Sequence, residues 1–268
     1  MSESLEVLLS TATEAARLGG GVLQSWSTRF TPREKSPANL VTEADEASQQ
    51  AIVEYIDQRH PGHAYLGEEG LRRDTDSPYR WIIDPLDGTS NYVHRFPYYA
   101  VSIGLEQAGE LIVGVIYDPN RDEMFAAAKG QGATLNSEPI STTVESDVGH
   151  AMCMASLPIR AGKEHPAVQR FLRVLDVAQT VQRTGSAALN LCCVACGRID
   201  AFWSSSLNPW DQAAGALIVR EAGGRVTKVD GSTFDVNAPD LLATNGTDLH
   251  AGLSDLLMLI PDASRPAG

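Results

Sequence analysis

The sequence predicts an α+β protein, a mixed α/β arrangement in which helices are layered on sheets. Residues 98–106 and 111–117 alternate apolar and polar side chains around Ala108-Gly109-Glu110, which is typical of a β-hairpin. Apolar residues also recur at helical spacing over about 4–27 and about 209–222. Because both kinds of element must bury an apolar face, we expect helices stacked on sheets.

Length and composition are those of an ordinary globular protein. The 268 residues are enough for one large domain or two small ones, and we place a boundary in the polar segment 141–149. The halves are then 1–145, which carries most of the candidate acidic residues, and 146–268. A chain that is 43% hydrophobic and 21% charged can bury a substantial core.

The charge balance is acidic and argues against several kinds of partner. The formal net charge of −13 disfavours nucleic acid or an anionic membrane as the main partner. No apolar run is long enough to span a bilayer, and the N-terminus lacks the basic start and apolar run of a signal peptide. Four cysteines are too few for a disulfide scaffold. We therefore expect a cytoplasmic protein.

The first half of the chain contains two helical patterns followed by strands. Leu5, Leu8 and Ala12 share one face of the first helix, and Pro61-Gly62 ends the second. The elements expected here are a helix over about 4–27, a polar linker over 29–39, a helix from about 42–45 to Pro61, a strand over 64–66, an exposed loop to Tyr79, a strand over 81–84, the hairpin and a strand over 122–128.

The second half alternates strands with helices. Asn208 is the expected N-cap of a helix that has Pro209 in its first turn and ends at Gly223-Gly224. Cys192, Cys193 and Cys196 lie in an apolar helix without a second ligand pair, which favours core packing over zinc binding. The elements expected here are strands over 151–157, 180–184 and 199–203, helices over 167–177, 186–196 and 209–222, two short strands, a helix over about 247–258 and a frayed end over 261–268.

One stretch is central to the interpretation of the whole chain. It reads Trp81-Ile82-Ile83-Asp84-Pro85-Leu86-Asp87-Gly88-Thr89-Ser90-Asn91. Its apolar start predicts a buried strand that ends at Asp84, because Pro85 cannot donate to a strand ladder. Asp87-Gly88 predicts a turn, and Thr89 or Ser90 can cap a following helix.

Two carboxylates, Asp84 and Asp87, therefore stand at a strand end and beside a helix start. Carboxylate oxygens are ligands for Mg²⁺, and the free N–H groups of Gly88, Thr89 and Ser90 can bind a phosphate. Bound cations would also reconcile a phosphate substrate with an acidic chain. The alternative interpretation is a surface turn, in which Asp-Pro and Asp-Gly are common.

Two further acidic motifs lie on either side of this stretch in the sequence. They are Gly67-Glu68-Glu69-Gly70 before it and Pro209-Trp210-Asp211-Gln212-Ala213-Ala214-Gly215 after it. In this order the three motifs resemble the inositol monophosphatase family of magnesium-dependent, lithium-sensitive phosphatases. The resemblance runs from about Lys35 to about Val226. It implies the family's fold, a five-layer αβαβα sandwich of the sugar-phosphatase type, and a homodimer.

The resemblance also implies a site for two to three Mg²⁺ ions. Glu68, Asp84 and the carbonyl oxygen of Leu86 would hold the first ion, and Asp84, Asp87 and Asp211 would hold the second. A third, weaker ion would contact Glu68 through water molecules. The alternative for Asp211 is a helix-start carboxylate that complements the helix dipole.

The implied catalytic residues are Asp45, Thr89 and Glu68. Thr89 would orient the attacking water, and Asp45 would lie close enough to accept its proton, although Asp45 or Thr42 can also serve as a helix cap. Lys35 would lie near the metals, or else be a solvated lysine, and we interpret Glu69 as a solvated neighbour.

The implied substrate contacts combine the central turn with a second turn. The Gly185-Ser186-Ala187 turn opens a predicted helix, so its N–H groups would meet substrate hydroxyls, and Ser186 can cap that helix at the same time. The implied contact residues are Asp87, Gly88, Thr89, Ser90, Gly185, Ser186, Ala187, Ser204 and Asp211.

The expected activity is Mg²⁺-dependent hydrolysis of a small phosphate monoester such as inositol 1-phosphate. Histidinol phosphate, fructose 1,6-bisphosphate and 3′-phosphoadenosine 5′-phosphate are alternative substrates, and a non-catalytic metal- and anion-binding regulatory protein is the alternative class. Animal-type members carry a glutamate at the position of Ser204 that accepts hydrogen bonds from inositol. Because a serine replaces the charge-assisted bond with a weaker neutral one, we expect looser recognition of inositol.

Overall fold

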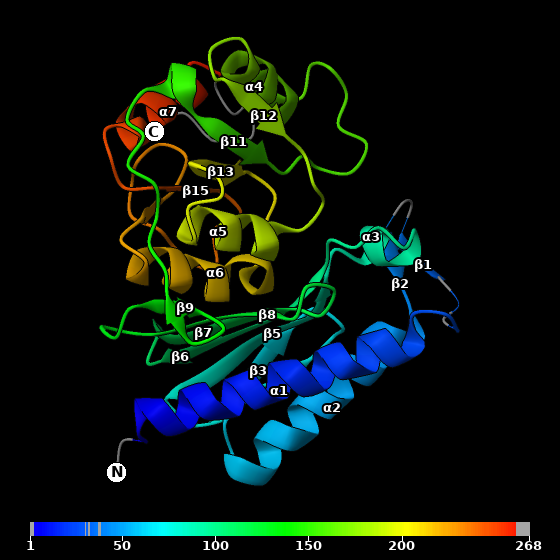
Figure 1. The fold of residues 1–268 in the computed structure, drawn as a ribbon. Helices are drawn as coiled ribbons and strands as arrows, with labels where there is room; N and C mark the ends of the chain where they lie inside the picture. The colour runs from blue at the N-terminus through cyan, green and yellow to red at the C-terminus, as the bar shows by residue number, and fades with distance from the viewer. Residues whose placement is uncertain (1–2, 30, 32, 37–38, 261–268) are drawn as a thin grey trace.

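Helices and sheets alternate in five layers in this computed structural model. The structure describes residues 3–29, 31, 33–36 and 39–260, and for residues 34–36 and 39–41 it describes the backbone alone. Figure 1 shows the layers from bottom to top: two helices, an eight-stranded sheet, two helices, a five-stranded sheet and two further helices. The five-layer αβαβα expectation is confirmed. No helix in the described ranges is long and apolar enough to cross a membrane.

The first layer is the pair α1 (Leu5–Trp26) and α2 (Glu43–Arg59), which packs on one face of the large sheet. The apolar stripe of α1, which includes Leu8, Ala12 and Ala16, is fully buried. At the start of α2 the Thr42 side chain accepts a hydrogen bond from the Ala44 N–H. Both helices therefore begin and end within a few residues of the predicted positions.

The eight-stranded sheet has the order β10-β9-β8-β7-β6-β5-β3-β4. All pairs are antiparallel except β3 with β5, and β6 and β7 form the hairpin that the sequence predicts. Helices cover both faces, which explains the long apolar runs of the central strands. The strands are β3 (Ala64–Gly67), β4 (Arg72–Arg73), β5 (Tyr79–Asp87), β6 (Ala100–Gln107), β7 (Glu110–Asp118), β8 (Glu123–Ala128), β9 (Ala133–Leu135) and β10 (Glu138–Pro139).

Several short strands lie where the sequence predicts loops. Strand β1 (Arg33–Ser36) lies within the predicted polar linker and pairs with β2 (Asn39–Val41), which begins at the end of that linker, and β4 lies within the predicted exposed loop. These strands are too short and polar to show an apolar alternation, so pattern analysis misses them. The Lys35 side chain and the predicted frayed end, 261–268, lie outside the described residues.

The five-stranded sheet has the order β12-β11-β13-β15-β14, and α4 (Pro166–Leu175) and α7 (Leu249–Met258) cover its outer face (Figure 1). Its first strand follows the short 3₁₀ helix Val148–His150. The division at residue 145 into two halves stays a prediction. The strands are β11 (Met152–Ala155), β12 (Thr180–Gln182), β13 (Ala201–Ser204), β14 (Arg225–Thr227) and β15 (Leu241–Thr244).

The middle layer consists of α5 (Ala187–Ala195) and α6 (Pro209–Glu221), which lie between the two sheets. Every residue of α5 is buried, and Cys192 and Cys193 pack in the same apolar cluster as the inner faces of both sheets. The prediction that these cysteines fill the core is confirmed.

Helix α6 approaches the large sheet closely because two strands carry glycine at the contact. A Cβ atom on Gly104 of β6 would lie 2.9 Å from the Ala213 side chain, and one on Gly114 of β7 would lie 2.5 Å from the Ala214 carbonyl oxygen. Distances this short require the backbone of α6 to shift. The distance between α6 and the large sheet therefore depends on these glycines. The position of Asp211, in the first turn of α6, depends on them as well.

We predict that Gly114→Ala lowers the free energy of unfolding by roughly 1–3 kcal/mol, the usual cost of overpacking a core. Gly21→Ala is the matched control, because no atom lies within 4 Å of a Cβ built at this position in α1. It should stabilise the protein by up to roughly 1 kcal/mol through helix propensity. Urea titrations measure both values, and a Gly114→Ala midpoint equal to that of the wild type would contradict the close-contact argument.

Candidate active site

Strand β5 does not end at Asp84 but continues through an irregularity to Asp87. Asp84 pairs with Ser102 and Asp87 pairs with Ala100, so β5 advances by three residues over a length in which β6 advances by two. The extra residue is a β-bulge at the point where Pro85 lacks an N–H. The expectation that regular pairing breaks at Pro85 is correct, whereas the expected strand end is wrong.

The bulge determines the direction of the two carboxylates. In a regular strand, residues three positions apart point to opposite faces. One inserted residue restores the same face, and one carboxylate oxygen each of Asp84, Asp87 and Asp211 lies within 4.8 Å of the other two. Asp211 reaches them from the first turn of α6, 124 residues beyond Asp87 in the sequence.

Glu68 stands at the end of β3, beside the same cluster. The N–H of Glu68 donates to the carbonyl oxygen of Ile83 on the neighbouring β5, with an N···O distance of 3.3 Å. The charge of Glu68 contributes to a raised pKa at Asp84, Asp87, Asp211 and also Asp45. The structure therefore brings all four predicted acidic ligands together.

Burial and mutual repulsion keep the pKa values of these carboxyl groups above their usual range. Burial raises the pKa of Asp84 well above normal, and the charges of Glu68, Asp87 and Asp211 add to the effect. Burial raises the pKa of Asp87 to about 6 and that of Asp211 to about 8. Like charges this close together do not all ionise readily unless a cation accompanies them.

Asp45 and Thr89 face each other across the site. The Thr89 hydroxyl lies 3.4 Å from Asp45 Oδ1 and 3.2 Å from the Leu86 carbonyl oxygen, so it can donate to either. Asp45 Oδ2 accepts hydrogen bonds from the N–H and hydroxyl of Thr42. Burial raises the pKa of Asp45 to about 6 although these bonds oppose the shift. The capping role and the site position predicted for Asp45 thus coexist.

Helix α3 (Thr89–Val93) starts directly after the carboxylates. Its N-cap is Gly88, with φ of 97°, and not Thr89 or Ser90 as expected from the sequence. A side chain at Gly88 would strain the left-handed backbone and would lie 3.0 Å from the Tyr98 carbonyl oxygen. The glycine lets the chain turn tightly, so that Thr89 becomes the first helical residue and its hydroxyl turns toward Asp45.

Asp87 is held by the N-terminus of α5. Its carboxylate accepts hydrogen bonds from the Ser186 hydroxyl, from the Ala188 N–H at 2.8 Å and from the Ala187 N–H at 3.3 Å. The Ser186 oxygen also accepts from the Leu189 N–H, which confirms the predicted cap. The Gly185–Ala187 turn is therefore adjacent to the acidic cluster.

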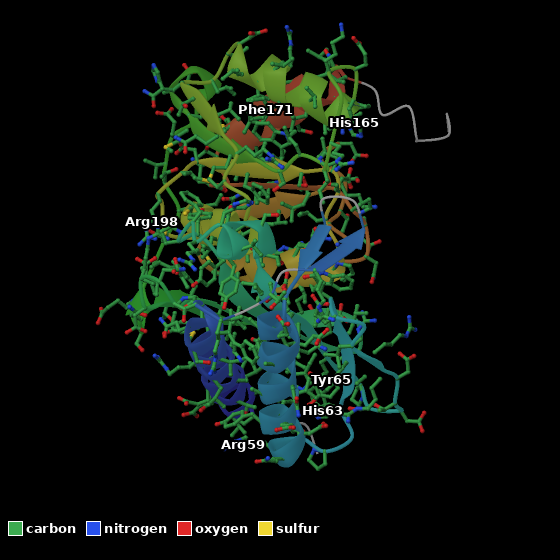
Figure 2. All side chains as sticks on the ribbon, turned by 90° about the vertical axis from the view of Figure 1, so that its right-hand side faces the viewer. Arg59, His63, Tyr65, His165, Phe171 and Arg198 are labelled. Carbon is green, nitrogen blue, oxygen red and sulfur yellow. The ribbon has the colours of Figure 1, made fainter. Side chains whose placement is uncertain are left out.

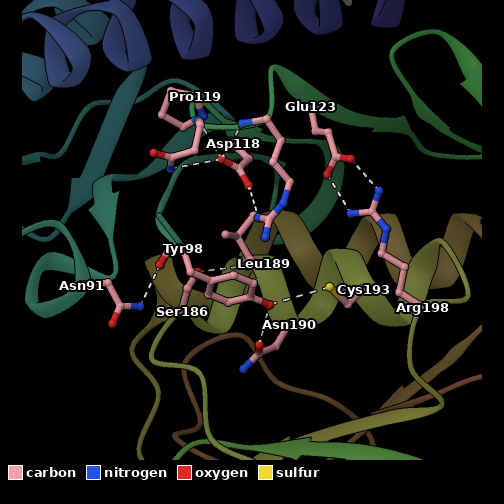
Figure 3. Close-up of polar contacts among 12 residues, drawn as sticks. Asn91, Tyr98, Asp118, Pro119, Glu123, Ser186, Leu189, Asn190, Cys193 and Arg198 are labelled. Carbon is pink, nitrogen blue, oxygen red and sulfur yellow. Dashed lines mark hydrogen bonds and ion pairs between the residues drawn. The ribbon is translucent and has the colours of Figure 1, made fainter. Parts of the chain in front are cut away.

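A closed set of hydrogen bonds fixes this turn against α3. Asn91 Nδ2 donates to the carbonyl oxygens of Tyr98 and Thr184 at 2.7 and 2.9 Å. The hydroxyls of Tyr98 and Thr184 in turn donate to Asn190 Oδ1 at 3.0 and 2.6 Å. Figure 3 shows Tyr98 between Asn91 and Asn190, with its hydroxyl also near Cys193. The two turns that line the site are thus tied together.

A cavity of about 700 Å³ opens beside the acidic cluster. Its walls come from both turns, from residues 156–159 and from residues 206–207. The predicted contact residues that line it are Asp87, Gly88, Thr89, Ser90, Gly185, Ala187 and Asp211. The other lining residues are Asn91, Phe96, Ser156, Leu157, Pro158, Ile159, Arg183, Thr184, Ser206 and Leu207.

Ser204 does not line this cavity. It is fully buried at the end of β13, and its hydroxyl oxygen accepts a hydrogen bond from the Ser206 N–H at 3.3 Å. Ser206 is exposed and lines the cavity instead. Counting along the sequence cannot detect that the chain turns here, and residues 156–159 carry no motif that could have identified them.

A second group of possible ligands, Glu3, His60 and His63, lies away from the cavity. Figure 2 places His63 near Arg59. Arg59 is the last residue of α2, whereas Asp45 lies in its first turn. Trp81 Nε1 can only donate, and it lies 3.0 Å from His63 Nδ1, so His63 Nε2 carries the proton that faces Glu3. Both His63 nitrogens are committed to hydrogen bonds, which disfavours metal binding in this group.

The carboxylate cluster, in contrast, has the donor set of a divalent cation site. Its oxygens are hard ligands at close range, and their raised pKa values indicate that positive charge is needed for full ionisation. The N-terminus of α3 beside them suits an anion. A buried carboxylate cluster beside a helix start in a five-layer α/β fold defines a metal-dependent phosphatase.

Comparisons with known proteins agree with this class. The inositol monophosphatase family pattern matches residues 4–259. The inositol-1-monophosphatase of Synechocystis sp. is 42% identical over 96% of this chain and 91% of the relative. The Nus factor SuhB of Escherichia coli is 35% identical over 96% of this chain and 98% of the relative. A solved inositol monophosphatase from Anabaena superposes with a TM-score of 0.85, at 40% identity over 97% of this chain and 98% of that one.

The chain therefore belongs to the inositol monophosphatase family. As a member it is a phosphoric monoester hydrolase whose activity depends on metal ions.

We predict that the metal-free protein loses on the order of 1–2 kcal/mol of stability between pH 6.5 and 8.5. In this window the folded protein still holds the proton of Asp211, whose pKa is raised to about 8, whereas the unfolded chain has released it. Stability therefore falls as pH rises. Urea titrations in a chelator measure this slope, and Asp211→Asn is the control that should reduce it, since Asp84 with its own raised pKa remains. A slope of the opposite sign would contradict the raised pKa.

Proposed function

We propose that this chain hydrolyses a small phosphate monoester with Mg²⁺, and that inositol 1-phosphate or a related polyol or sugar phosphate is its substrate. The observation that supports this most directly is the approach of Asp84, Asp87 and Asp211 to within 4.8 Å beside the cavity. Hard oxygen donors in this number favour Mg²⁺ over softer metals. All the acidic ligands and Thr89 are present, which disfavours a purely regulatory, non-catalytic role.

The residues have distinct proposed roles. Glu68, Asp84, Asp87, Asp211 and the Leu86 carbonyl oxygen would hold two to three Mg²⁺ ions. When bound, these ions lower the pKa of a water molecule and neutralise charge on the phosphate.

Groups of the protein itself bind the phosphate, orient the water and accept its proton. The N–H groups of Gly88 and Thr89 bind the phosphate at the start of α3. The Thr89 hydroxyl orients the attacking water, and Asp45 accepts its proton. The water oxygen bonds to phosphorus, the bond from phosphorus to the ester oxygen breaks, and the alcohol leaves after taking up a proton from solvent.

The cavity wall favours loose recognition of the alcohol. Asp87 and Asp211 are the acids that line it in the described part of the chain, and both belong to the proposed metal site. Asn91, Arg183 and several serine and threonine hydroxyls supply the other polar contacts. A wall that offers no further acid to accept hydrogen bonds from the alcohol suits several hydroxylated substrates, so histidinol phosphate, fructose 1,6-bisphosphate and 3′-phosphoadenosine 5′-phosphate belong in the same assay.

Release of inorganic phosphate from these monoesters, with and without Mg²⁺, tests the proposal. No release from any of them at any Mg²⁺ concentration would overturn it. A homodimer, a cytoplasmic location and the lack of a nucleic-acid partner stay predictions, the last of which rests on the net charge of −13.

We predict that Glu68→Gln lowers kcat at least about a hundredfold, because a charged group that acts in the transition state is typically worth this much. Glu54→Gln is the control, since it removes the same charge from the exposed face of α2, and its kcat should stay within a fewfold of wild type. Steady-state kinetics at saturating Mg²⁺ distinguish the two. Equal losses in both variants would mean that net charge, and not Glu68 itself, matters.

We predict that lithium inhibits at millimolar order, as expected for a member of a lithium-sensitive family. A monovalent ion in one metal position supplies less charge than Mg²⁺ and should stall the enzyme after binding. The measurement is a lithium titration at fixed Mg²⁺ with potassium chloride as the ionic-strength control. A response identical to that of potassium would contradict the prediction.

A further inference from the structure

The cavity contains one basic side chain that the proposed mechanism does not use. Arg183 is the sole lysine or arginine among the described residues that line the cavity. It lies two residues before Gly185, in the turn that Asn91 fixes through its bond to the Thr184 carbonyl oxygen at 2.9 Å. The backbone that carries Arg183 is therefore held in place at the cavity wall.

The guanidinium of Arg183 makes no hydrogen bond or ion pair with any residue in the described ranges. Some surface arginines pair with acids, such as Arg198 with Glu123 at 2.7 Å (Figure 3). Exposed arginines such as Arg160 and Arg173 have no acid partner in the described ranges, but they do not line the cavity, whereas Arg183 stands unpaired beside its acidic residues. If Arg183 served to neutralise Asp87 or Asp211, it would be paired with them. Its counter-charge is therefore expected to come from a ligand.

The cavity mouth also carries two exposed apolar side chains. Phe96 is 54% exposed and Ile159 is 53% exposed, and they come from loops distant in sequence. An aromatic ring and a branched aliphatic group at the rim suit the face of a ring better than open water. The volume of about 700 Å³ lies well within the range of about 300–1,000 Å³ that larger ligands occupy.

We propose that Arg183 binds a second anionic group of the substrate, and that the preferred substrates are ring-containing phosphate monoesters with a further phosphate or carboxylate. The reacting phosphate lies at the acidic cluster and α3, the ring lies along the rim, and the second anion meets the guanidinium. Arginine forms paired hydrogen bonds with phosphate and carboxylate that a lysine cannot match. This inference rests on the proposed phosphatase activity and adds the chemical class of its substrate.

The test compares substrates that differ only by the second anion. Fructose 1,6-bisphosphate is paired with fructose 1-phosphate, and 3′-phosphoadenosine 5′-phosphate is paired with adenosine 3′-phosphate. The first pair tests substrates in which the ring is a sugar, and the second tests substrates in which it belongs to a nucleoside. For each pair the ratio of kcat/KM with the second anion to kcat/KM without it is measured in wild type, Arg183→Gln, Arg183→Lys and Arg160→Gln.

Arg160→Gln is the matched control, because Arg160 follows the lining residue Ile159 but does not itself line the cavity. In wild type we expect the ratio to exceed one for at least one pair. Arg183→Gln should lower it roughly ten- to a hundredfold, the usual effect of losing a hydrogen bond to a charged group. Arg183→Lys should restore part of the ratio, and Arg160→Gln should leave it within about twofold.

Three results would overturn the proposal. One is a wild-type ratio of one or less for both pairs while monoesters are hydrolysed, which would leave the proposed activity intact. Another is an equal fall in Arg183→Gln and Arg160→Gln, which would indicate general charge attraction. The third is an unchanged ratio in Arg183→Gln together with a smaller mass by light scattering, which would assign the guanidinium to a subunit contact. Absence of any hydrolysis would instead overturn the activity itself.

Discussion

Repulsion between buried carboxylates is the constraint on which the site depends. Asp84 and Asp87 are buried, and one carboxylate oxygen of each lies within 4.8 Å of one from the half-buried Asp211. Backbone and hydroxyl donors offset part of this repulsion, as when three groups of α5 bind Asp87. The pKa values remain raised nevertheless, so hydrogen bonds alone do not balance the charge. In the proposed mechanism divalent cations would supply the remainder, and the same charge would draw an anionic substrate to an acidic protein.

The rest of the fold holds these groups against their repulsion. The bulge in β5 turns Asp84 and Asp87 to one side of the sheet, and the large sheet anchors β5 between β3 and β6. Glycines in β6 and β7 let α6 approach until its first turn reaches the cluster. Each carboxylate thus comes from a rigid element, which suits a site that must keep its geometry with and without its cations.

The cavity divides into a rigid part and a variable part. The proposed phosphate side consists of backbone N–H groups at helix starts, and Asn91 ties the two turns together. The alcohol side is formed by loop residues such as Phe96, Ile159 and Arg183. Loops tolerate substitution better than packed elements, so a common phosphate chemistry can serve different alcohols. This division explains why the reaction class follows from the motifs whereas the substrate depends on the loop walls.

The sequence by itself determined nearly all helices and longer strands and, through the resemblance of its motifs to a known family, the layered fold and the acidic residues of the candidate site, because apolar periodicity and short motifs are local signals. Tertiary structure alone decided the bulge at Pro85, the Gly88 cap, and the small strands β1, β2 and β4, since these depend on pairing partners. It also decided that Ser206 and not Ser204 meets the cavity, and that Arg183 and Phe96 join the site. Which side chains face a common space is set by packing between distant segments, and no local pattern encodes that.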